Sequence, residues 1–150
     1  MRLHTTLVLS GAAAGLLLAA CSAAPAATPT PAGPPPPLSL EPADLQAEYA
    51  ALPAGDPATG QTAFTTAGCA ACHALEPEKR IVGPALAGIA TRAGERESGL
   101  SAELYLYKSI TRPDAYVVET FTPGLMPKTF IDTLTPQTQA DLLAFLLTLK

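Results

Sequence analysis

The chain has 150 residues, a formal net charge of −4, and an aromatic content of only 5% with no tryptophan. This length suits a single domain with tails, whose few large side chains would bury only a modest core unless another group fills its centre. The acidic balance argues against nucleic-acid binding, and nothing in the composition indicates a polybasic membrane patch.

Residues 1–20 have the pattern of a bacterial lipoprotein signal peptide. Arg2 is the basic n-region, and residues 7–20 form an apolar run that is shorter than the roughly 20 residues of a membrane-spanning helix. The run leads into LAAC (18–21), which resembles a lipobox and predicts cleavage before Cys21, whose thiol then carries lipid. Ordinary signal-peptide cleavage nearby, with Cys21 incidental, is the alternative. We expect an extracytoplasmic, periplasmic-side protein that is anchored to the membrane through Cys21.

Residues 21–53 are predicted to form a lipidated cysteine followed by a linker rich in proline and alanine. Residues 22–37 contain only Ser, Ala, Pro, Thr and Gly, which favour extended polyproline II geometry and offer no face to bury. At about 3.1 Å per residue, this segment could hold a domain up to roughly 50 Å from its anchor. A short helix is expected within 41–52, and the folded domain is expected to span 54–150.

The first predicted helix of the domain follows Asp56, a good N-cap, and Pro57, which suits a first helical position. Gly68 is expected to end it just before Cys69. The second predicted helix spans 101–111 with Ser101 as its N-cap. Its apolar face is expected to contain Leu104, Tyr107 and Ile110, at helical spacing.

The third predicted helix spans 135–150, with Thr135 as its N-cap and Pro136 in its first turn. Its apolar residues recur with a 3.6-residue period, which is typical of a helix with one buried face. The nearest approach to a strand is 115–121, and no run alternates convincingly for more than about four residues. The sequence therefore predicts an all-α fold.

The chemistry-bearing motif is Cys69, Cys72 and His73, which form C-x-x-C-H. On a short helical turn, a two-residue gap places both thiols along one edge of a porphyrin, where they can form thioether bonds with its vinyl groups. The next residue then projects its imidazole to the iron, which makes the pattern the c-type haem attachment signature. A large flat apolar ring would also fill a core that is poor in aromatic side chains.

Three other chemistries compete for the same residues. A thioredoxin-like redox pair needs a βαβ setting, whereas the neighbouring segments have helical patterns. A zinc site needs a fourth ligand, and after removal of residues 1–20 the only further Cys or His is the distant Cys21. A disulfide between cysteines so close in sequence is strained and leaves His73 without a role. One covalently bound haem c is the favoured interpretation.

With these residues in place, the sequence resembles class I monohaem cytochromes c over roughly residues 57–150. GQTAFTTAGCAACH (60–73) is similar to the family's opening helix and haem motif, and VGPAL (82–86) follows at the expected distance. The remainder looks especially like small membrane-anchored cytochromes of bacteria. The resemblance implies the class I cytochrome c fold, in which three main helices and loops wrap around one covalent haem.

The resemblance also implies roles for single residues. Gly60 and Phe64 would lie where the first helix crosses the last, with Phe145 as the aromatic partner. The carbonyl group of Pro84 would accept a hydrogen bond from the imidazole of His73, which would fix the ring and raise its basicity. His73 and the two cysteines would then form the proximal side of a haem site.

Met126, in GLMPK, is the candidate for the second axial ligand of the iron, because the family has its distal methionine in a loop before the last helix. It is the only methionine that remains after residues 1–20 are removed. Pro127 favours an extended backbone at Met126, which suits a loop laid across a flat ring. Lys128 is the nearby alternative donor, and a plain core position is the alternative role for Met126.

Other residues receive weaker assignments. The charged segments 76–80 and 92–97 are expected to be solvated loops. Four residues are candidates for the wall of the haem pocket, with an ordinary core role as good for the two tyrosines: Leu86, Ile89, Tyr105 and Tyr107.

The resemblance implies one-electron transfer by a membrane-tethered carrier with His/Met ligation, rather than an enzyme, because such an iron has no vacant position for a substrate. The first hypothesis is a shuttle between a quinol-oxidising complex and a terminal oxidase or reaction centre of an electron-transport chain. A permanent monohaem subunit of a larger membrane oxidoreductase, such as alternative complex III, is the second. A five-coordinate haem that binds gas or reduces peroxide is the third, and it requires that Met126 is not a ligand.

Overall fold

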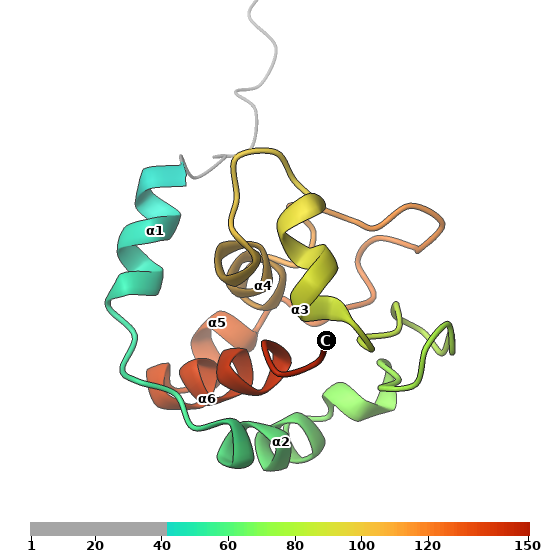
Figure 1. Cartoon of the computed structure of the whole chain (residues 1–150), viewed down its shortest axis with the longest axis horizontal. Coiled ribbons are helices and arrows are strands. Elements are labelled where there is room, and N and C mark those ends of the chain that lie inside the picture. The colour runs from blue at the N-terminus through green and yellow to red at the C-terminus, as the bar shows by residue number, and fades with distance from the viewer. Residues whose placement is uncertain (1–41) are drawn as a thin grey trace, which may run out of the picture. The chain divides into compact units, whose positions relative to one another are not determined.

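Helices and loops make up residues 42–150, the part of the chain that the computed structural model describes, and no strand occurs within them. The all-α prediction is therefore confirmed for this part. The predicted signal peptide, the lipidated Cys21 and the linker up to residue 41 lie outside the described residues. The α-helices are, in chain order, α1 (Pro42–Ala50), α2 (Pro57–Thr66), α3 (Ile89–Arg92), α4 (Ala102–Thr111), α5 (Phe130–Thr133) and α6 (Pro136–Leu146) (Figure 1).

Two 3₁₀ turns, η1 (Cys69–Ala71) and η2 (Ala93–Glu95), complete the described secondary structure. No helix within residues 42–150 is both long enough and apolar enough to cross a membrane.

The three main helices, α2, α4 and α6, begin at the predicted N-caps. A cap side chain satisfies one of the backbone amides that the first helical turn leaves without a partner. In each helix, the cap accepts from the amide three residues on: Asp56 from Thr59 at 2.7 Å, Ser101 from Leu104 at 3.3 Å and Thr135 from Thr138 at 3.1 Å. The starts of these helices are thus set by local chemistry.

The last helix ends earlier than the expected residue 150. Its final α-helical residue is Leu146, and Leu147 is its C-cap. The carbonyl group of Leu149 instead accepts a hydrogen bond from the amide of Ala90 in α3, at 3.0 Å. Directly after the helix, the amides of Thr148 and Leu149 donate to the carbonyl groups of Phe145 and Leu146, so the α-helix ends in a tighter turn with three-residue spacing.

Helices α2 and α6 lie side by side and in close contact (Figure 1). A Cβ atom added to Gly60 would lie 1.9 Å from the carbonyl oxygen of Asp141 and 2.8 Å from the Cβ atom of Phe145. The rings of Phe64 and Phe145 are tilted by 54° with centroids 5.6 Å apart, a favourable aromatic geometry. The implied pairing of Phe64 with Phe145 at this crossing is confirmed.

Gly60→Ala is expected to destabilise the domain, although alanine in a helix interior is normally better than glycine by about 1 kcal/mol. The added methyl group would push α2 away from the backbone of α6, so we expect the free energy of unfolding to fall by about 3 kcal/mol or more. Denaturant unfolding of the holoprotein, followed by helical circular dichroism, measures the change. Gln61→Ala, an exposed change on the same helix, is the control and should have little effect.

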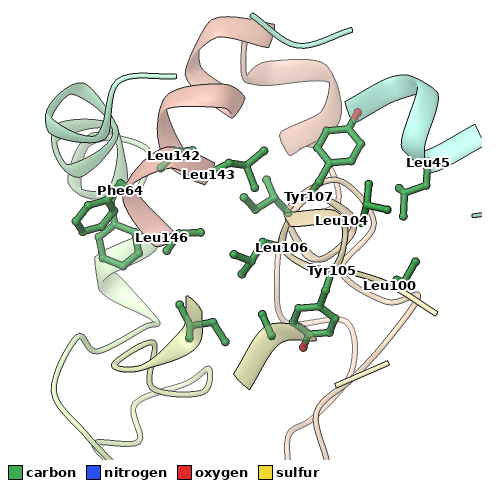
Figure 2. Close-up of a cluster of buried hydrophobic side chains, with 14 residues drawn as sticks. Leu45, Phe64, Leu100, Leu104, Tyr105, Leu106, Tyr107, Leu142, Leu143 and Leu146 are labelled. Atoms are coloured by element: carbon green, nitrogen blue, oxygen red, sulfur yellow. The ribbon is translucent and has the colours of Figure 1, made fainter. Parts of the chain in front are cut away.

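Helix α4 contributes a continuous run of buried residues to the core. Its residues Leu104, Tyr105, Leu106 and Tyr107 are all at least 93% buried, and they pack with α6 and neighbouring segments (Figure 2). Tyr105 and Tyr107 point to opposite sides of α4 (Figure 2), because residues two apart on a helix are separated by about 200°. One of the two tyrosines must therefore face away from any pocket that the other lines.

Tyr107 faces α1. Its hydroxyl group donates to Glu48 at 3.2 Å, and its ring centroid lies 6.1 Å from that of Tyr49. Burial, and then the Glu48 carboxylate, raise the pKa of Tyr107, which keeps the hydroxyl group protonated as the donor. The expectation that Tyr107 lines the pocket is wrong, whereas its predicted place on the apolar face of the helix is confirmed.

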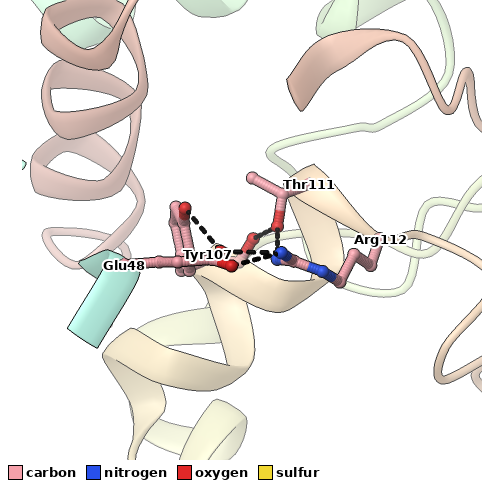
Figure 3. A network of polar contacts seen from close by, with 4 residues as sticks. All are labelled: Glu48, Tyr107, Thr111 and Arg112. Carbon is pink, nitrogen blue, oxygen red and sulfur yellow. Dashed lines mark hydrogen bonds and ion pairs between the residues drawn. The ribbon is translucent and has the colours of Figure 1, made fainter. Parts of the chain in front are cut away.

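Helix α1 confirms the short helix expected within 41–52 and packs on α4. Its Leu45 is only 2% exposed. Its Glu48 forms an ion pair with Arg112, with both carboxylate oxygens within 2.8 Å of one guanidinium nitrogen, and Arg112 also donates to Thr111 at 3.0 Å (Figure 3). This helix lies ahead of residue 54, where the folded domain was expected to begin.

Candidate functional site

The haem motif follows the end of α2 directly. Gly68 has a φ angle of +83°, a left-handed conformation that glycine adopts without strain, and it turns the chain into η1. The amides of Cys72 and His73 both donate to the carbonyl group of Cys69, at 3.2 and 3.0 Å. The C-x-x-C-H segment is thus a single tight turn with two half-buried, unbridged thiols. Burial raises the pKa of the Cys69 thiol.

The segment of residues 83–86 runs alongside this turn. The amide of Gly83 donates to Cys72 at 2.9 Å, and the amide of Leu86 donates to Ala74 at 2.8 Å. These two bonds place the carbonyl oxygen of Pro84 2.9 Å from Nδ1 of His73. Since a carbonyl oxygen can only accept, Nδ1 carries the proton and Nε2 keeps its lone pair for a metal.

The backbone also fixes the orientation of the His73 ring. A Cβ atom added to Gly83 would lie 2.4 Å from Cε1 of His73, so the imidazole packs directly against a residue without a side chain. The Pro84 hydrogen bond and the Gly83 contact together leave the ring little freedom to rotate. This arrangement would hold the imidazole of His73 in one orientation toward a bound metal.

The motif opens onto a cavity of about 500 Å³. Cys69, Cys72, His73, Pro84 and Met126 all line it. The structure therefore brings the five predicted site residues to one cavity, although Cys69 and Met126 lie far apart in the chain.

The walls of the cavity are mostly apolar. Three of the four expected wall residues line it, namely Leu86, Ile89 and Tyr105. The ring of Tyr105 packs edge-on against that of Tyr116, with centroids 5.6 Å apart. Helices α2, α4 and α6 add further wall residues: Phe64, Leu106, Ile110, Leu142 and Leu146. Such a lining suits a large flat apolar group and excludes water from its faces.

Met126 reaches the cavity from an irregular segment between α4 and α5. It is half-buried, whereas Leu125 and Pro127 on either side are exposed. Leu125 is 55% exposed, and Val82, which also lines the cavity, is 46% exposed. The cavity thus has an apolar rim that is open to solvent.

Two arginines at the cavity were not predicted. Arg92 and Arg96 both line it and are half-buried, so the expectation of a solvated loop at 92–97 is wrong for these residues. Arg92 donates to the carbonyl groups of Ala85 and Ala87. Burial, and then the charge of Arg96, lower the pKa of the Arg92 guanidinium, which nonetheless remains charged at neutral pH.

Neither arginine forms an ion pair with a carboxylate within residues 42–150. Two half-buried positive charges on one wall favour an anionic group in the cavity. Their spacing of four residues is a sequence signal that they share a helical face. No local rule indicates that this face lines a cavity.

The segment of residues 76–80 is exposed as expected. Its last residue, Arg80, lies 4.1 Å from the centroid of the Phe121 ring and donates to the hydroxyl group of Thr120 at 3.1 Å. Phe121 lines the cavity. Arg80 therefore joins the loop after the haem motif to residues 120 and 121, just ahead of the irregular segment that carries Met126.

The described residues lack features that a thioredoxin-like redox pair or a zinc site would need. They contain no strand and hence no βαβ unit around the two cysteines. They also contain no group of three or more His, Cys, Asp or Glu side chains that could hold a metal ion. An apolar cavity with two thiols, an oriented imidazole and a thioether fits haem, because haem needs attachment points, axial ligands and apolar walls together.

The helical fold and this donor set define a c-type haem protein. The family model described as cytochrome c matches residues 57–150, and the chain belongs to the cytochrome c family. Members of this family hold haem c through covalent bonds and use its iron for electron transfer. No curated protein and no solved structure matches the chain in the corresponding comparisons.

Proposed function

We propose that the protein is a membrane-tethered carrier of single electrons whose haem iron has His73 and Met126 as its axial ligands. The observation that carries this proposal is that an imidazole with its Nδ1 proton directed at Pro84 lines the same apolar cavity as Met126. Bound haem supplies the one-electron couple. With both axial positions filled, the iron has no vacant position for a substrate, which favours a carrier over an enzyme.

Each axial residue has a distinct effect on the redox couple. The Pro84 hydrogen bond raises the basicity of His73 and holds its ring in one orientation. The soft sulfur of Met126 favours the ferrous state and raises the reduction potential. The apolar walls keep water from the ring, so little solvent has to reorganise when the charge of the iron changes.

Arg92 and Arg96 are the residues proposed to receive the propionate carboxylates of the haem. They line the cavity without a carboxylate partner in the described part of the chain. Guanidinium groups bind carboxylates through charge-assisted hydrogen bonds. This contact would neutralise the two propionate charges at the cavity wall.

The exposed apolar side chains at the cavity support a docking role for its rim. Val82 and Leu125 both line the cavity and are about half exposed. Partners of the carrier would approach this rim, where the distance to the haem is shortest. The proposed partners are a quinol-oxidising complex as donor and a terminal oxidase or reaction centre as acceptor, and the tether would raise their effective concentration.

Cys21→Ala is expected to release the holoprotein from membranes, because the proposed lipid on Cys21 is the only anchor in the proposal. The visible spectrum of the released protein should be unchanged, because the substitution lies outside the haem domain. Washing of membranes, followed by haem staining of pellet and supernatant, measures the effect. A variant that stays in the pellet and elutes with other subunits after detergent extraction would favour a permanent subunit of a larger oxidoreductase over a shuttle.

A further inference from the structure

The segment that carries Met126 has few ties to the rest of the domain. Residues 122–128 contain no helix, and all of them are exposed except Met126. Residues 122–127 line the cavity, so they pack against the group that fills it and not against buried core side chains. Besides that packing, the position of the Met126 sulfur depends on the polar contacts of the segment and on the bond that the sulfur would make to the iron.

Within residues 42–150, two polar contacts join this segment to residues that precede it. The amide of Gly124 donates to Oδ1 of Asp114 at 3.0 Å, and the ammonium group of Lys128 pairs with Oδ2 of Asp114. Both contacts thus end on a single carboxylate. Gly124 lies two residues before Met126 and Lys128 two residues after it, so this carboxylate brackets the methionine.

Other contacts hold the backbone around Asp114 in place. Asp114 follows the end of α4 by three residues, and the amide of Ala115 donates to Arg112 at 2.9 Å. Arg112 is in turn held by the ion pair with Glu48 of α1 (Figure 3). Contact with Lys128, and with the Gly124 amide after it, lowers the pKa of Asp114, so the carboxylate is an ionised acceptor at neutral pH.

We propose that Asp114 is a positioning residue that holds Met126 at the cavity by fixing the backbone on both sides of it. Both contacts reach one exposed, ionised carboxylate, and each holds the backbone on one side of Met126. Gly124 has a φ angle of +76°, and the carboxylate therefore holds the chain at a turn that directs residue 126 inwards. The ion pair also keeps the amine of Lys128, the alternative donor, at Asp114. This inference rests on the proposed ligation by Met126.

Asp114→Ala in the full-length holoprotein tests the proposal at pH 7. Carbon monoxide binds the ferrous iron only when the sulfur has left it, so the rate of binding reports the fraction of molecules with the sulfur off. We expect this rate to rise by about tenfold or more, as for the loss of a charge-assisted hydrogen bond. The far-red sulfur-to-iron band of the oxidised protein should also disappear at a lower temperature than in the wild type.

Matched variants separate the two contacts. Asp114→Asn keeps an oxygen that can accept from Gly124, and Lys128→Gln removes only the ion pair. Both should raise the rate far less than Asp114→Ala does. Asp132→Ala removes an exposed carboxylate from α5 and should leave the rate at the wild-type value. Helical circular dichroism should melt at nearly the same temperature in all of these proteins.

Two results would overturn the positioning role while leaving Met126 as a ligand. One is a wild-type far-red band together with equal rates for Asp114→Ala and Asp132→Ala. The other is loss of the band and of helical structure at the same lowered temperature in Asp114→Ala, which would make the carboxylate a general stabiliser of the domain. A wild-type protein without the band would overturn both this inference and the proposed ligation.

Discussion

Met126→Ala is expected to abolish the far-red sulfur-to-iron band of the oxidised protein and to open one axial position of the iron. Carbon monoxide should then bind the ferrous form rapidly, and azide should bind the ferric form. The reduction potential should fall, because the variant has lost a soft ligand that favours ferrous iron, most clearly if a hard ligand such as hydroxide takes its place. Absorption spectra and a redox titration measure these changes.

The neighbouring residue provides a matched control for this substitution. Leu125 lines the same cavity and is 55% exposed, so Leu125→Ala should leave the band, the ligand binding and the potential near their wild-type values. Met126→His should keep six-coordination and still lower the potential. If Met126 has only a packing role, Met126→Ala should instead cost a modest amount of stability and leave the spectrum unchanged.

The double change Cys69→Ala with Cys72→Ala is expected to leave little folded protein. Without the two thioether bonds, haem is no longer held permanently in the cavity of about 500 Å³. At about 24 cal/mol per Å³, an empty cavity of this volume would cost up to roughly 12 kcal/mol, which equals the whole stability of a typical domain. Water that enters the cavity lowers this cost, but only slightly, because water interacts weakly with apolar walls.

Two measurements check the prediction for the cysteines. Acid–organic extraction of the wild type should leave haem on the polypeptide, because thioether bonds survive this treatment. Circular dichroism of the double variant should show loss of helical structure, whereas Cys21→Ala should keep both haem and helices. Extractable haem from the wild type, or a double variant that is as helical as the wild type, would contradict the assigned attachment.

Features of the fold with a local cause could be predicted from the sequence. Asp56, Ser101 and Thr135 were expected as N-caps, and each accepts the expected amide hydrogen bond. Gly68 was expected to end α2 because glycine favours the left-handed conformation that it adopts there. The packing of Phe64 on Phe145 followed from the resemblance to a known family, because no local pattern pairs residues so far apart.

Features that depend on distant contacts could not be predicted. Tyr107 faces α1 because Glu48 lies there, and no periodicity within α4 reveals which side the cavity occupies. Helix α6 ends at Leu146, and Leu149 beyond it accepts a hydrogen bond from Ala90, whereas the sequence there has neither glycine nor proline as a stop signal.

The residues of the candidate site also fall into two groups, those that the sequence predicted and those that it did not. Its cysteines and His73 are adjacent in sequence, so the motif alone predicted them. The roles proposed for Arg92 and Asp114 involve the haem or residues far along the chain, so no local sequence pattern indicates them. Ligation by His73 and Met126 stays a prediction, which the shared cavity supports.

We propose that the iron of the wild-type protein has two protein ligands and therefore carries electrons instead of binding a substrate. Rapid mixing of the ferrous wild-type holoprotein with carbon monoxide tests it most directly, because this gas needs a vacant axial position. The proposal predicts that carbon monoxide binds slowly or not at all, at a rate limited by departure of the Met126 sulfur. Fast, stoichiometric binding would contradict the carrier role and favour a haem that binds gas or reduces peroxide.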